Sequence, residues 1–143
     1  WLLPKRSSVK ARVIDANIVL RFLLDDHPEQ SPRARELMRR VRDGEETVVL
    51  PEVVVSDIAW TLRSFYHWPA EQIRAFVRSL LTLKGVRGVR REVLLHALDI
   101  FAKFNVDFSD ALIAAEMLWT GQEEIYSYDR DFDRIPGLRR VEP

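Results

Sequence analysis

The sequence predicts an α/β fold: a three-layer α/β/α sandwich around a mainly parallel sheet of about four or five strands. Short β-branched runs such as Thr47–Leu50 alternate with helical patterns of about ten residues or more. Connections of this length favour right-handed crossovers and parallel strands covered by helices. The length of 143 residues suits one domain. We expect residues 12–143 to form it, after an N-terminal extension over residues 1–11.

The expected elements follow from apolar spacing and from residues that start or stop helices. The expected helices cover Ile18–Leu24, the stretch around Ala34–Val41 that Asp43-Gly44 ends, the stretch after Pro51, Ile73 to about Gly85, Arg91–Phe104, and the run from Ala111 to Gly121. The third of these helices presents an apolar face made of Val54, Val55, Ile58, Leu62 and Phe65. The expected strands are Val13–Ile14, Thr47–Leu50, Glu124–Tyr128 and Leu138–Val141.

Composition excludes several classes of protein. No apolar run approaches the roughly 20 residues that cross a bilayer, so we expect no membrane association. The chain has no cysteine, which excludes disulfides, thiolate metal sites and a cysteine nucleophile and fits a cytoplasmic protein. The 22 basic and 22 acidic residues cancel, so any binding of nucleic acid must depend on local groups.

Four aspartates are candidates for one catalytic site: Asp15, Asp57, Asp110 and Asp129. Asp15 and Asp129 follow expected strands, and ligands of parallel sheets bind at the carboxyl ends of the strands. Carboxylates that share a cleft repel each other unless a cation offsets their charge. Because oxygen ligands favour hard cations, Mg²⁺ or Mn²⁺ is the expected cofactor, and phosphodiester hydrolysis is the expected chemistry.

Each aspartate also has a structural interpretation. The position of Asp15 is equally typical of a helix N-cap and of a catalytic residue. Asp107 and Asp110 form a capping-box pattern, and this pattern taken alone favours a structural role over a catalytic one. Asp129 fits ordinary turn chemistry. Asp57 interrupts an apolar stretch, where a charge needs a partner.

Three segments together resemble the signature segments of PIN-domain nucleases: Val13–Asn17, Val106–Ala115 and Ser127–Phe132. The similarity extends over residues 12–142 and is greatest to the VapC-type toxins of prokaryotic toxin–antitoxin pairs. It implies a PIN-like fold, Mg²⁺- or Mn²⁺-dependent cleavage of RNA, and inhibition by a cognate antitoxin; a homodimer is also expected.

The resemblance assigns roles by position. Asp15, Asp110 and Asp129 match the metal-binding aspartates. Polar or acidic neighbours of these ligands are Asn17, Asp107, Ser109, Ser127 and Asp131. Two basic residues beside the acidic segments, Arg21 and Arg130, are candidates for phosphate contact or antitoxin capture.

Two positions depart from the family pattern. Asp57 stands where Glu is usual, which shortens the side chain by one methylene, and Ala16 stands where Thr or Ser is common. These departures leave open a housekeeping PIN nuclease in RNA processing or repair and a catalytically weak binding scaffold. Trp60 projects away from the apolar face of its helix, so it contacts either a partner or the neighbouring fourth helix. Phe76, Leu80 and Leu81 are interpreted as core or dimer surface.

Overall fold

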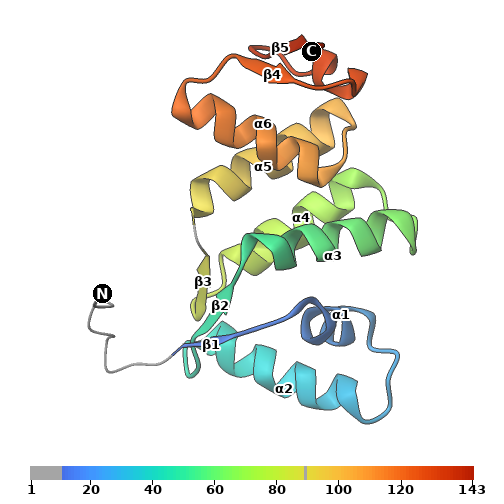
Figure 1. The fold of residues 1–143 in the computed structure, drawn as a ribbon. Coiled ribbons are helices and arrows are strands. Elements are labelled where there is room, and N and C mark those ends of the chain that lie inside the picture. Colours follow the sequence, from blue (N-terminus) through green and yellow to red (C-terminus); the bar gives the residue numbers. More distant parts are fainter. Residues whose placement is uncertain (1–10, 89) are drawn as a thin grey trace.

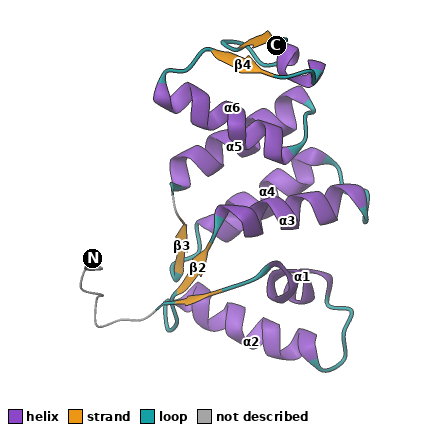
Figure 2. Cartoon of the chain, viewed as in Figure 1, coloured by secondary structure: helices purple, strands orange, loops and turns teal. Residues whose placement is uncertain are grey.

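The computed structural model describes residues 11–88 and 90–143, so the expected N-terminal extension lies outside the described residues apart from residue 11. The helices are α1 (Ala16–Leu24), α2 (Gln30–Asp43), α3 (Glu52–Ser64), α4 (Ala70–Leu81), α5 (Arg91–Phe104), α6 (Phe108–Thr120) and the 3₁₀ helix η1 (Arg130–Arg134). The strands are β1 (Arg12–Val13), β2 (Val48–Leu50), β3 (Val86–Gly88), β4 (Glu124–Tyr126) and β5 (Arg139–Val141). Figure 2 colours the helices, strands and loops separately.

All strand pairs are parallel, as the alternation of strands and helices predicts. One sheet has the order β1-β2-β3, with Val13 beside Val49 and Val49 beside Arg87. A second sheet pairs β4 with β5. The α/β fold class is therefore confirmed, but the main sheet has fewer strands than the four or five predicted. The second sheet lies at one end of the molecule, and α5 and α6 separate it from the part that holds the first sheet and α1 to α4 (Figure 1).

Local signals fix most element boundaries. The Asp15 carboxylate accepts a hydrogen bond of 3.1 Å from the Ile18 amide and caps α1. Gly44 ends α2 with a φ of 77°, a left-handed conformation that glycine adopts without a steric penalty. Pro51 precedes α3, where its missing amide proton costs nothing.

The core is continuous from α1 to η1 and consists of aliphatic and aromatic side chains. The α5–α6 pair contributes much of it, because small residues on α6 let the two helices approach closely; these are Ala111, Ala114 and Ala115, all 0% exposed. Leu80 and Leu81 are buried in this core. The prediction for Phe65 is wrong: this residue caps the carboxyl end of α3 and is 70% exposed, because the helix ends before it can turn back toward the core.

The three-stranded sheet is buried on one face only. Ile14, Val48, Leu50 and Val86 are nearly inaccessible, whereas Val13 is 67% exposed and Arg87 is exposed on the opposite face. Successive side chains alternate between the faces of a strand, so the exposed residues mark one open face. Within residues 11–88 and 90–143, every helix is too short or too polar to span a bilayer.

Two strand predictions need correction. Strand β3 was not expected, because Val86-Arg87-Gly88 carries a single apolar residue and its pairing with β2 depends on tertiary contacts. Strand β4 ends at Tyr126 instead of Tyr128, since Ser127 and the residues after it form the turn into η1.

Candidate active site

The structure brings three carboxyl groups together beside the second sheet. Asp110, Asp129 and Asp131 each place a carboxylate oxygen within 4.8 Å of the others. Asp110 and Asp131 are half-buried and Asp129 is exposed. We call these three residues the acidic cluster.

Each member of the acidic cluster is placed by a different local feature. Asp110 lies in the first turn of α6, where the helix dipole favours a negative charge. Asp129 follows β4, and its amide donates to the Ser127 hydroxyl at 2.9 Å. The Asp129 carboxylate in turn accepts a 2.9 Å hydrogen bond from the Asp131 amide. This turn fixes Asp129 and Asp131 side by side, and the turn interpretation of Asp129 is compatible with a role in the site.

The capping interpretation of Asp107 is wrong. Asp107 occupies the N-cap position of α6, but its side chain makes no capping hydrogen bond. The backbone carbonyl of Asp107 alone engages the helix, accepting from the Ala111 amide at 2.9 Å. The Asp107 carboxylate is exposed and remains available to the site.

Burial and electrostatic repulsion both raise the pKa of Asp110. Partial burial, together with the negative charges of Asp129 and Asp107, raises the pKa of Asp110 from 3.8 to about 6. Burial disfavours the charged carboxylate, and neighbouring carboxylates disfavour it further. A cation bound beside these carboxylates would favour the charged form of Asp110 and offset both causes.

Asp15 does not join the acidic cluster. It is exposed at the carboxyl end of β1, in the other sheet, and it caps α1 as described above. Asn17 and Arg21 line the same surface hollow as Asp15, between α1 and α2. The Arg21 guanidinium donates to the Gln30 side chain at 2.9 Å and lies 3.5 Å from the Asp26 carboxylate. The separation arises because the strands before Asp15 and Asp129 belong to different sheets.

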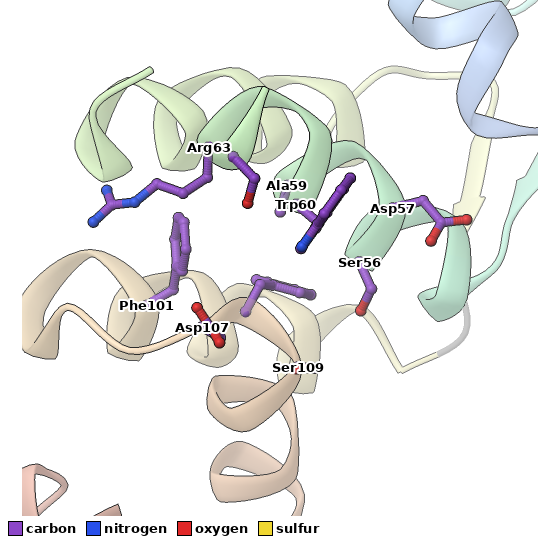
Figure 3. A pocket seen from close by; sticks show the side chains of 10 residues that line it. Ser56, Asp57, Ala59, Trp60, Arg63, Phe101, Asp107 and Ser109 are labelled. Carbon is purple, nitrogen blue, oxygen red and sulfur yellow. The ribbon is translucent and has the colours of Figure 1, made fainter. Parts of the chain in front are cut away.

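Asp57 also lies outside the acidic cluster. It is exposed on α3 and lines a pocket of about 230 Å³ between α3 and the start of α6 (Figure 3). Trp60 lines the same pocket and is 66% exposed, so the predicted alternative in which it packs against the fourth helix is wrong. Asp107 and Ser109 line the pocket on its α6 side.

Sequence reasoning missed the role of Arg63 in this pocket. Its guanidinium lies 5.9 Å from the centre of the Phe101 ring and donates to the Asn105 side chain. Asp57, Trp60 and Arg63 recur every three residues on α3, and this helical spacing was the available signal. Arg130, at the start of η1, is exposed next to Asp129.

The residues of the acidic cluster fit a divalent cation. All three offer carboxylate oxygens, the ligand type that Mg²⁺ and Mn²⁺ prefer. The raised pKa of Asp110 supplies a second indication, because a bound cation would offset the repulsion that raises it. The donor set and its electrostatics therefore suit a hard metal ion.

Comparison with known proteins agrees with this geometry. A search of curated proteins finds no match to the chain. The family model for the PIN domain matches residues 12–138, a range that includes Asp15, Asp57 and the acidic cluster. PIN domains have a three-layer α/β/α fold and typically bind divalent metal ions. The chain therefore belongs to the PIN domain family, whose members are generally metal-dependent nucleases.

Proposed function

We propose that this protein is a Mg²⁺- or Mn²⁺-dependent endoribonuclease that hydrolyses RNA phosphodiester bonds. The observation that carries the proposal is the acidic cluster, three converging carboxylates in a chain that belongs to a family of nucleases. In the proposed site, Asp110 and Asp129 hold the metal and Asp131 supports them. The family resemblance implies Asp15 as a further ligand, but within one chain Asp15 follows β1 in the other sheet.

The chain's own residues supply orientation and charge. The hydrogen bonds from the Asp129 amide to Ser127 and from the Asp131 amide to Asp129 fix the carboxylates before any substrate arrives. When bound, the metal supplies activation of water and stabilisation of the leaving oxygen. No nucleophilic side chain is then required.

Substrate contacts are proposed on both sides of the acidic cluster. Arg130 is exposed beside Asp129, where a guanidinium can contact a phosphate through two parallel hydrogen bonds. Ser109 lies beside Asp110 at the start of α6 and lines the pocket that contains Trp60. Asp57, in that pocket, is proposed to act near the substrate and not as a direct member of the acidic cluster.

We further propose that the protein is the toxin of a toxin–antitoxin pair, with a cognate antitoxin as its partner. The support is the resemblance of its three signature segments to VapC-type toxins and the exposure of Trp60. A large aromatic side chain exposed beside a charged pocket is typical of a partner-binding surface. A short neighbouring reading frame for a small DNA-binding protein is the genetic observation that this role predicts.

The test of the nuclease function is direct. Purified protein is incubated with single-stranded RNA in Mg²⁺, in Mn²⁺ and in EDTA, and the new RNA ends are sequenced. Discrete ends that require the metal are expected. Intact RNA in all three conditions would favour a binding scaffold. Cleavage that persists in EDTA would contradict the proposed metal dependence.

A further inference from the structure

Each of the two sheets that the structure describes has two edge strands, β1 and β3 in the first and β4 and β5 in the second. In the part of the chain that the structure describes, β1 pairs with β2 alone and β4 pairs with β5 alone. An edge strand presents a row of backbone N–H and C=O groups that another strand can extend. Both edges belong to parallel sheets, so each can accept a parallel neighbour.

The open faces of the two sheets are complementary. The main sheet exposes the face that carries Val13, and its Ile14 face is buried. In the second sheet Ile125 packs against the core, whereas Tyr126 on the opposite face is 77% exposed. Parallel sheets occur almost only with both faces covered. A sheet that joined β1 to β4, with Val13 and Ile125 on one face, would place a helical layer on each side.

We propose that β4 of a second copy of this chain pairs in parallel with β1, and that the exchange is reciprocal. Asp15 of one copy then approaches the acidic cluster of the other, so that each site is shared between two chains. The role assigned to Asp15 rests on the proposed function, whereas the strand pairing does not. A two-fold arrangement pairs the β1 and β4 edges of both copies at once, leaves β3 and β5 as the outer edges, and closes the assembly as a dimer.

Burial and charge select one register for this pairing. When Val13 lies beside Ile125, Arg12 lies beside Glu124, and opposite charges on adjacent strands are favourable. Within one chain Arg12 pairs with Glu46 at 3.4 Å and Glu124 pairs with Arg139, so the new contact would link these two ion pairs. The same register sets Asp15 beside Ser127, whose hydroxyl accepts from the Asp129 amide. The carboxylate that sequence similarity assigns to the site thus reaches it through β-pairing.

Contacts within the chain favour a second copy over self-pairing. The two sheets lie apart, with α5 and α6 between them (Figure 1). Arg90 ties α3 to α6 by ion pairs of 2.8 Å to Glu52 and 2.7 Å to Glu116. Helix α4 also packs against α5, and α3 packs against α6. Self-pairing would have to move the second sheet past this packed interior, whereas a second copy leaves it intact.

The absence of native cysteine makes the pairing testable by cross-linking. Val13→Cys and Ile125→Cys chains, carrying tags of different size, are co-expressed and treated with a short thiol-specific cross-linker. A covalent product containing both tags is expected. Val53→Cys replaces Val13→Cys in the control, because Val53 is equally exposed, at 66%, but lies on α3. If Ile125→Cys fails to fold by circular dichroism, Arg12→Cys and Glu124→Cys take the place of the Val13 and Ile125 pair, since both side chains are exposed and lie side by side in the same register.

The outcomes separate the alternatives. A single chain that carries both Val13→Cys and Ile125→Cys is treated in parallel. A cross-link within that chain but no product containing both tags would overturn the exchange in favour of self-pairing, and no cross-link in either sample would overturn the pairing itself. The product forms whether or not the protein cleaves RNA, so a mixed dimer without cleavage would contradict the nuclease function and leave the exchange intact.

Complementation tests the shared site. Asp15→Asn and Asp129→Asn chains are co-expressed; each mixed dimer retains one site with both aspartates. Because about half of the dimers are mixed, activity should return to roughly one quarter of wild type. Activity no higher than that of either variant alone, in a preparation that still forms mixed dimers, would overturn the sharing.

Discussion

The carboxyl groups of Asp110 and Asp129 approach within 4.8 Å, although one begins α6 and the other follows β4. The Asp129 charge is one reason why the pKa of Asp110 rises to about 6. The two carboxylates therefore repel each other in the metal-free protein, and this repulsion has several measurable consequences.

The first consequence concerns Asp110→Asn and pH. The folded protein holds the Asp110 proton up to about pH 6, whereas the unfolded chain releases it near 3.8. Folding stability therefore falls as pH rises between these values and stays lower above them. Asn cannot ionise, so the variant should be more stable than wild type at pH 7 without metal. Because Asp110 is partly exposed, the gain is discounted to on the order of 1 kcal/mol, or about 3 °C in Tm.

Thermal melts at pH 3.5 and pH 7 check this expectation. The difference between variant and wild type should be small at the lower pH and should grow at the higher one. Glu123→Gln serves as the control, because Glu123 is exposed and lies outside the acidic cluster. An Asp110→Asn protein that melts below wild type at pH 7 in EDTA would argue against stored repulsion.

The second consequence concerns metal binding measured without cleavage. A cation that binds only the folded state stabilises it by about 2.7 kcal/mol at roughly 100 times its Kd. Mn²⁺ should therefore raise the Tm of wild type by several degrees. Asp129→Asn and Asp131→Asn should each reduce that shift, whereas Glu123→Gln should keep it. Equal shifts in all four proteins would place the bound ion elsewhere.

The third prediction concerns Asp57, where the chain departs from the usual Glu. Asp57 is exposed, so Asp57→Ala and Asp57→Glu should each change stability by less than about 0.5 kcal/mol. If Asp57 acts near the substrate, Asp57→Ala should lower the cleavage rate by about tenfold or more, which corresponds to ~1.4 kcal/mol of activation free energy. Asp57→Glu should retain activity. Cleavage by Asp57→Ala at the wild-type rate would remove Asp57 from the site.

The fourth prediction concerns the glycine that sets β3 beside β2. A Cβ atom at Gly85 would lie 2.1 Å from the Glu46 carbonyl and 2.7 Å from the Val41 carbonyl, and neither backbone atom can move freely. Gly85→Ala should therefore destabilise the protein by about 3 kcal/mol or more. Gly88→Ala is the matched control, because its Cβ would meet only side chains, at 3.7 and 3.9 Å. Urea denaturation of both variants measures the difference, and similar midpoints would contradict it.

Much of the fold could be predicted from sequence because its signals are local. Apolar spacing located the six α-helices, and Gly44 and Gly121 marked the ends of two of them. Strand β3 escaped detection because three residues with one apolar side chain carry no alternating pattern. Its formation depends on pairing with β2, a contact that no local signal encodes.

The candidate site was only partly predictable for a similar reason. Asp110 and Asp129 were identified from their segments, and the structure does bring them together. Asp131 was predicted only as an acidic neighbour, yet the turn that its amide makes with Asp129 carries it into the acidic cluster. Asp15 was expected in the same cleft because its strand and β4 were assigned to one sheet. The order of strands across sheets is set by long-range packing, so a single sequence did not reveal the separation.

The central claim is that the acidic cluster holds the metal that RNA cleavage requires. The most direct measurement compares cleavage of one single-stranded RNA by wild type, Asp110→Asn, Asp129→Asn and Glu123→Gln in Mn²⁺, after melts establish that all four are folded. We expect wild type and Glu123→Gln to cleave the RNA and to lose this activity in EDTA. The two cluster variants should cleave at least about a hundredfold more slowly, which corresponds to ~2.7 kcal/mol. Cleavage at the wild-type rate by either Asp110→Asn or Asp129→Asn would contradict the claim that the acidic cluster holds the metal.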